Sequence, residues 1–141
     1  MAQQRTGAAQ NAAGARPRLR ILIADDERDT VATLAAILQD EGHEVREVYR
    51  GTEVLRLAQA FDPDVALIDI GMPGMTGSDV ARELREQFGK ARPLLIAVTG
   101  WKQASDKILA KLAGFDHHLP KPFEPDALLT LLKPLGTPPG G

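Results

Sequence analysis

The chain has 141 residues, the length of one domain, and its 43% of hydrophobic residues is enough for a core. Its formal net charge of −2 argues against a nucleic-acid binder, which would show a basic footprint. The absence of cysteine excludes disulfides, thiolate metal sites and cysteine nucleophiles. No stretch of the sequence is apolar enough to span a membrane. The lack of cysteine fits a reducing cytoplasm, where we expect the protein to be.

Both ends of the chain are predicted to be tails. Residues 1–17 are rich in Ala, Gln and Gly, and they cannot bury enough surface to offset the entropy of ordering. An organelle transit peptide is the alternative for this acid-free start, but serines and an apolar face are missing. We therefore expect a disordered N-terminal tail, one domain at residues 18–135, and a flexible tail at residues 136–141.

Short apolar runs alternate with helical patterns along this domain. The predicted strands are residues 21–24, 45–48, 65–68, 94–98 and 117–119. Helical spacing gives three apolar stripes: Val31, Leu34, Ala35 and Leu38; Val54, Leu57, Ala58 and Phe61; Leu128, Leu131, Leu132 and Leu135. Candidate helix boundaries are Gly42 and Gly114 as stops, Thr52 and Ser78 as N-caps, and Pro125 in a first turn. Five such units predict a parallel sheet with helices on both faces.

Polar residues stand where the predicted strands end. Asp25 and Asp26 follow the first strand, Asp69 the third, Thr99 the fourth and Lys121 the last. All carboxyl ends of a parallel sheet lie at one edge, which is where open α/β sheets bind ligands. Residues almost 100 positions apart are therefore expected to converge there.

The residue types at this edge indicate phosphoryl chemistry at a metal site. Two like charges 4 Å apart cost roughly 4 kcal/mol at an effective dielectric of 20, so three carboxylates need a cation. Oxygen-only ligands favour a hard ion such as Mg²⁺, a carboxylate can attack phosphorus, and a lysine and a hydroxyl can stabilise the transferred group. Taken singly, each residue is also an ordinary loop acid, strand-end residue or surface lysine, and only the joint arrangement predicts the site.

Four segments, ILIADDE, VALIDIGMPGMTG, LLIAVTG and GFDHHLPKPF, occur in this order. Together they resemble the receiver domains of two-component response regulators over residues 19 to about 135. The motifs are closest to those of receivers in hybrid sensor kinases. The resemblance implies a flavodoxin-like (βα)5 three-layer sandwich with a five-stranded parallel sheet of order 2-1-3-4-5.

The resemblance also implies a phosphoacceptor and a set of metal ligands. Asp69 would accept the phosphoryl group. Asp26 and Asp69 would bind Mg²⁺ directly, together with the backbone carbonyl of Gly71, and Asp25 would act mainly through a bound water. His43, His117 and His118 have no spacing expected of a metal site.

Further roles implied by the resemblance belong to the last two strands. Thr99 would hydrogen-bond the phosphoryl group and Lys121 would pair with it, while the bond before Pro122 would be cis. His118 stands where receivers usually carry the aromatic residue that switches together with the threonine, and Gly100 stands where they usually carry alanine. His118 is therefore either part of the switch, as imidazole titrates near neutral pH, or a passive, partly exposed ring.

We expect a stand-alone response regulator that receives its phosphoryl group from a histidine kinase or a histidine phosphotransfer protein. It would catalyse only its own phosphorylation and dephosphorylation, and would signal by protein contact or onward phosphorelay. The resemblance suggests a contact face made of the fourth helix, fifth strand and fifth helix. We expect no DNA-binding domain and no membrane partner.

Three other functions are alternatives to a stand-alone response regulator. An aspartyl-phosphate phosphatase would resemble a pattern with a second aspartate two residues after the nucleophile, where this chain has Gly71. A flavin module needs a phosphate-cradling loop after the first strand, where Asp25, Asp26 and Glu27 would repel a phosphate. The third alternative is a receiver that forms part of a larger hybrid kinase.

Overall fold

The computed structural model describes residues 18–72, 74–89, 93–100 and 113–136. The strands are β2 (Arg20–Ala24), β3 (Glu44–Val48), β4 (Val65–Asp69), β5 (Leu94–Thr99) and β6 (His117–Pro120). The helices are α2 (Arg28–Asp40), α3 (Val54–Phe61), α4 (Gly77–Phe88) and α6 (Pro125–Gly136), with a short 3-10 turn, η1 (Gly51–Glu53), before α3. Within these ranges no helix is long and apolar enough to cross a membrane.

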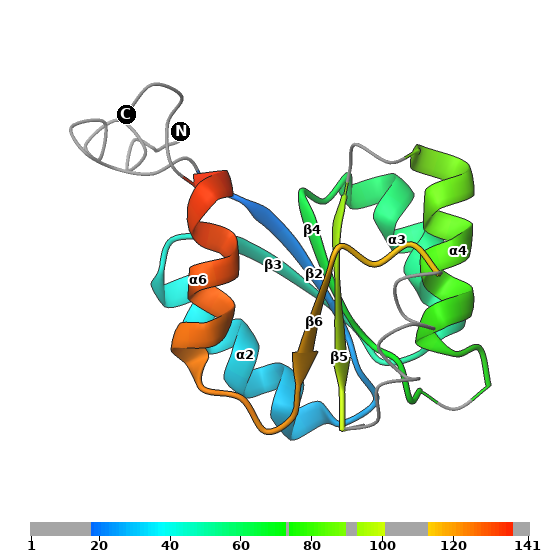
Figure 1. The fold of residues 1–141 in the computed structure, drawn as a ribbon. Helices are drawn as coiled ribbons and strands as arrows, with labels where there is room; N and C mark the ends of the chain where they lie inside the picture. The colour runs from blue at the N-terminus through cyan, green and yellow to red at the C-terminus, as the bar shows by residue number, and fades with distance from the viewer. Residues whose placement is uncertain (1–17, 73, 90–92, 101–112, 137–141) are drawn as a thin grey trace.

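The five strands form one parallel sheet in the order β3-β2-β4-β5-β6. Numbered along the chain this is 2-1-3-4-5, so the predicted sheet order is confirmed. Helices α2 and α6 cover one face of the sheet and α3 and α4 cover the other (Figure 1). The architecture is the flavodoxin-like three-layer sandwich that the sequence predicts.

Alternating residues of the central strands divide the core into two halves. Ile21 and Ile23 of β2 pack with the α2 and α6 side, whereas Leu22 and Ala24 pack with the α3 and α4 side. Strands covered on both faces have continuous apolar sequences, which explains the unbroken runs in β2, β4 and β5. Both faces of the central strands are buried, and this packing fixes where their carboxyl ends lie.

The predicted strands agree with the structure to within one residue at either end. Two predicted helix caps were wrong. Thr52 lies inside η1, and Ser78 lies inside α4, whose N-cap is Thr76. Leu135, placed in the third apolar stripe, is 39% exposed because it lies in the last turn of α6, beyond the core. The helix expected before Gly114 falls on residues 101–112, outside the described residues.

Candidate functional site

The register of β2 and β4 brings two of the predicted acids side by side. Ala24 pairs with Ile68, so the residues that follow each of them, Asp25 and Asp69, leave neighbouring strands at the same level. Both are buried, with 2% and 8% of their surface exposed, whereas Asp26 is exposed. The structure therefore places two carboxylates in the interior at the sheet edge and a third on its rim.

Asp25, Asp26 and Asp69 form a cluster that could hold a metal ion, because one carboxylate oxygen of each lies within 4.8 Å of the others. An octahedral Mg²⁺ with oxygens at about 2.1 Å sets opposite ligands about 4.2 Å apart. The three carboxylates are thus close to the spacing of such a site, and one ligand bound through water would relieve the difference. The all-oxygen donor set fits a hard divalent ion.

The Asp69 carboxylate is held by one backbone donor. The N–H of Gly71 donates to its Oδ1 at 3.0 Å. Burial raises the pKa of Asp69 to about 6, and the negative charge of Asp25 adds to the rise, while the Gly71 N–H and the charge of Lys121 oppose it. A buried carboxylate with an acidic neighbour gains stability when a cation or a proton neutralises it.

Gly77 allows α4 to begin directly beside this strand end. A Cβ on Gly77 would lie 2.6 Å from both the Asp69 carbonyl oxygen and the Ile70 Cα, so any side chain here would force the helix away. The helix start is fixed by a capping box, in which Thr76 and Asp79 bond each other's backbone N–H groups. This close backbone approach explains why glycine stands at position 77.

Lys121 supplies the positive charge at the cluster. Its Nζ lies 3.0 Å from Asp25 Oδ2, 3.1 Å from Glu27 Oε1 and 3.9 Å from Asp69 Oδ2. Burial lowers the pKa of Lys121, but its hydrogen bonds to Asp25 and Glu27 and the charge of Asp69 outweigh burial, so the pKa is raised overall. The ammonium is therefore firmly charged. The Lys121–Pro122 bond is cis, as the resemblance implies.

Glu27 also belongs to the site, as a partner of Lys121. This contact was not predicted from the sequence. Its N–H donates to Asp25 Oδ1 at 2.9 Å while its carboxylate accepts from Lys121. The signal was present, since Glu27 directly follows the acidic pair. From the sequence alone, Glu27 is expected only to repel a flavin phosphate.

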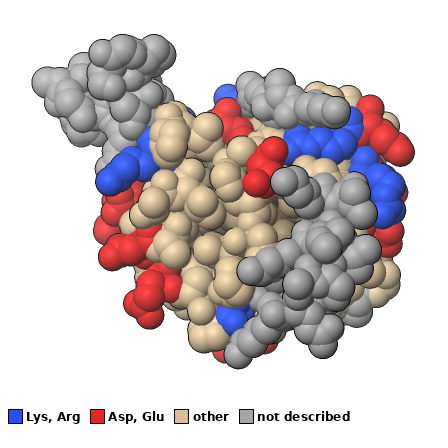
Figure 2. Space-filling model, viewed as in Figure 1, with Lys and Arg blue, Asp and Glu red and all other residues tan. Residues whose placement is uncertain are grey.

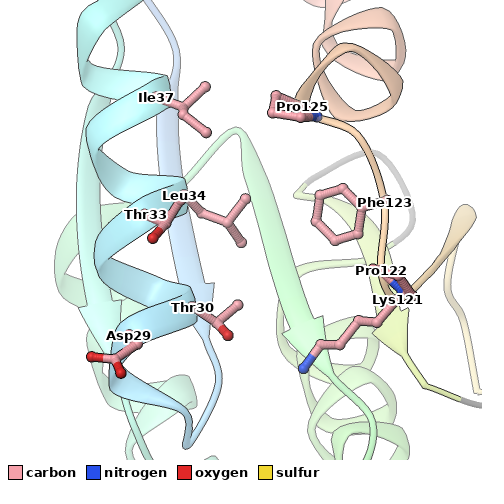
Figure 3. Close-up of a pocket in the computed structure, with 9 residues that line it drawn as sticks. All are labelled: Asp29, Thr30, Thr33, Leu34, Ile37, Lys121, Pro122, Phe123 and Pro125. Carbon is pink, nitrogen blue, oxygen red and sulfur yellow. The ribbon is translucent and has the colours of Figure 1, made fainter.

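An open pocket of about 390 Å³ lies beside Lys121, between α2 and the segment that follows β6 (Figure 3). Leu34 and Ile37 line it from the helix, and Phe123 lines it from the opposite side. The ammonium end of Lys121 points across it toward the start of α2. The lysine is thus reachable from solvent along one side, with 22% of its side chain exposed.

Comparison with known proteins identifies this arrangement. The protein-family model of the response regulator receiver domain matches residues 21–133. The chain belongs to the receiver-domain family. It is 40% identical over 108 residues to the aerobic respiration control protein ArcA of Escherichia coli K12, covering 77% of this chain and 44% of ArcA.

Two solved structures show the same receiver fold. The chemotaxis protein CheY4 of Vibrio cholerae has a TM-score of 0.78 and 30% identity, over 84% of this chain and 98% of that one. A receiver domain of a signal transduction histidine kinase from Syntrophus aciditrophicus has a TM-score of 0.76 and 27% identity, over 83% and 89% of the two chains. The chain spans about half the length of the curated relatives it matches, at 44 to 50%.

The other residues that the sequence predicts for the site lie on or next to β5 and β6. Thr99 is the last residue of β5, opposite Pro120 in the sheet register, and its side chain lies outside the described part of the structure. Gly100 is exposed, and no atom of the described residues lies within 4 Å of where its Cβ would be. His118 pairs with Ala97, which packs on the α3 and α4 side, so His118 lies on that face of the sheet. It is half-buried. Its role as a switch stays a prediction.

Proposed function

We propose that this receiver domain accepts a phosphoryl group on Asp69 from a phosphohistidine of a histidine kinase or a histidine phosphotransfer protein. The observation that carries the proposal is the Asp69 carboxylate itself. One of its oxygens is held by the Gly71 N–H, and it lies within a group of acids at the sheet edge with Lys121 close by. A structural aspartate would be paired fully with donors. Among the described residues, Lys121 Nζ is the donor nearest to Asp69 Oδ2, and at 3.9 Å it is too far for a hydrogen bond.

In this reaction an oxygen of the Asp69 carboxylate forms a bond to phosphorus. The P–N bond to the donor imidazole breaks, its electron pair stays on the imidazole, and the imidazole takes up a proton. Lys121 and the Thr99 hydroxyl would stabilise the charge of the phosphoryl oxygens. Attack of water on the aspartyl phosphate would later return inorganic phosphate and the free carboxylate. The domain would thus catalyse only its own phosphorylation and dephosphorylation.

The acidic cluster is suited to Mg²⁺ as the cofactor. Asp26, Asp69 and the carbonyl of Gly71 would hold the ion, and Asp25 would act through a water molecule. When bound, the ion would offset the repulsion between the carboxylates and the incoming phosphoryl oxygens. A second aspartate in place of Gly71 would be needed for a phosphatase of the aspartyl class, so the signalling role is favoured.

The output of the domain is proposed to be protein contact or onward phosphotransfer by a stand-alone regulator in the cytoplasm. Figure 2 shows that the middle of the face on which α6 and β6 lie is mainly uncharged, with acidic side chains along its left border. Leu135 is exposed on α6. A largely uncharged surface of this kind is compatible with protein contact.

Phosphorylation by a small phosphodonor such as acetyl phosphate tests the proposal. With Mg²⁺ the wild-type protein should gain one phosphoryl group, labile in base, which intact-mass spectrometry measures. Asp69→Asn and Asp69→Ala should abolish the gain, and a chelator should stop it. An unchanged phosphate in the Asp69→Ala variant would show that the phosphoacceptor is another residue.

A further inference from the structure

Three carboxylates compete for the Lys121 ammonium, and the structure shows which of them hold it. An ammonium has three N–H donors. Asp25 and Glu27 lie at hydrogen-bond distance, 3.0 Å and 3.1 Å, whereas Asp69 Oδ2 is 3.9 Å away, beyond a hydrogen bond. Lys121 is therefore held away from the residue that it would serve in phosphoryl transfer.

The two residues that hold Lys121 have different surroundings. Asp25 is buried, its Oδ1 accepts the Glu27 N–H, and it stands beside Asp69 on the neighbouring strand. A lysine that moves toward Asp69 can therefore stay close to Asp25. Glu27 is not a member of the carboxylate cluster, and 63% of its side chain is exposed. A lysine bonded to Glu27 is held toward the rim of the site.

Among the described residues, the Glu27 carboxylate makes no other hydrogen bond that would compete with this contact. Glu27 is the N-cap residue of α2, yet its side chain makes no capping hydrogen bond. Its carboxylate reaches instead to a lysine 94 residues further along the chain. The position of this side chain is thus explained by Lys121 and not by the helix.

We propose that Glu27 is a positioning residue that holds the Lys121 ammonium away from Asp69 until a phosphoryl group on Asp69 draws it in. The inference rests on the proposed function of Asp69. Lys121 exchanges the Glu27 carboxylate for phosphoryl oxygens, which carry more charge, and keeps Asp25 as its neighbour. Exposed ion pairs are weak, so Glu27 should shift this exchange by about two- to fivefold and not block it.

The experiment is a titration with beryllofluoride, which adds to a carboxylate in place of a phosphoryl group, at saturating Mg²⁺ and followed by backbone amide NMR. Glu27→Gln removes the charge, and Glu27→Asp keeps the charge but shortens the side chain by one methylene. Both variants should reach half-saturation at about two- to fivefold lower beryllofluoride than wild type. Asp29→Asn is the matched control, because its carboxylate is on the same turn but points away from Lys121 (Figure 3), and it should titrate like wild type.

A second arm tests whether Glu27 acts through Lys121. In the Lys121→Ala background, titrated over a wider concentration range, Glu27→Gln should have no further effect. The inference is overturned if Glu27→Asp titrates like wild type, if Asp29→Asn shifts as much as Glu27→Gln, or if the Glu27→Gln shift persists without Lys121. Failure of the proposed function looks different, since wild type would then not bind beryllofluoride, or Asp69→Ala would bind it equally well.

Discussion

Aspartates lie at both edges of the parallel sheet, but their partners differ. At the amino-terminal edge, Asp116 Oδ2 accepts the Leu95 N–H at 2.8 Å and pairs with Arg85. Asp64 Oδ2 likewise accepts the Arg20 N–H at 2.8 Å. Each of these carboxylates joins segments that are distant in sequence, and each accepts hydrogen bonds from N–H groups.

At the carboxyl-terminal edge the carboxylates face one another. One carboxylate oxygen of each of Asp25, Asp26 and Asp69 lies within 4.8 Å of the others, and Asp25 and Asp69 share Lys121 with Glu27. Such a group costs stability in the metal-free protein and becomes favourable only when a further cation arrives. The comparison separates acids that stabilise the fold from acids whose arrangement is explained by a ligand.

Loss of Arg85 should have the largest effect on stability. Its guanidinium donates to the carbonyls of Gly114, Gly89 and Pro93 and pairs with Asp116, so one side chain joins α4 to the segments before β5 and β6. Arg85→Met should lower the free energy of unfolding by about 2–3 kcal/mol in urea denaturation, because the partly buried carbonyls of Gly114 and Pro93 lose their donor and Asp116 loses its partner.

Arg82→Met is the matched control for Arg85. Arg82 lies one turn earlier on α4 and pairs with Asp79 at 3.1 Å, but it is 59% exposed. The change should cost less than about 0.5 kcal/mol. Equal losses in the two variants would mean that the amino-terminal edge contributes no special stability.

The same aspartate-to-asparagine change should have opposite signs at the two edges. Asp69→Asn removes a buried charge while keeping an acceptor for the Gly71 N–H, so it should raise the metal-free free energy of unfolding at pH 7.5 by about 1–2 kcal/mol. Asp116→Asn weakens the pair with Arg85 and should lower it. Chemical denaturation with a chelator present measures both.

The gain from Asp69→Asn should depend on pH in a stated direction. The pKa of Asp69 is about 6 in the folded protein, above the value of 3.8 for a free carboxyl, so between these pH values the folded state binds more protons than the unfolded state. Wild-type stability from this group therefore falls as the pH rises through this window. The gain should be complete above about pH 7 and absent below about pH 4, and a gain that does not change with pH would contradict the buried charge.

Much of the fold and the site could be predicted because both follow from the strands. Continuous apolar runs indicate buried parallel strands, and the acids after them must share an edge, so the closeness of Asp25 and Asp69 follows from β-sheet geometry. The Arg85 contacts could not be predicted, since a long side chain selects carbonyls that only the folded chain brings together. The contact between Glu27 and Lys121 could not be predicted for the same reason.

The wrong N-cap of α4 shows how two neighbouring residues can compete to begin a helix. Thr76 and Ser78 are both hydroxyl residues near the start of α4, and residue type alone does not decide between them. Asp79 stands three residues after Thr76, as a capping box requires, and no acid stands three residues after Ser78. The reciprocal hydrogen bonds decide the start of the helix.

Asp26 should show the smallest effect in the metal-free protein and a clear effect with Mg²⁺. It is the exposed member of the cluster, so Asp26→Asn should change the metal-free free energy of unfolding by less than about 0.5 kcal/mol. An ion that binds only the folded wild type at ten times its dissociation constant adds about 1.4 kcal/mol, and Asp26→Asn should lose most of this gain. Denaturation with and without Mg²⁺ measures both values, and Asp79→Asn, an acid outside the cluster, should keep the full Mg²⁺ gain. An Asp26→Asn protein that Mg²⁺ stabilises as strongly as wild type would leave Asp26 as a surface acid, and the metal would then have to be held by the two buried aspartates alone.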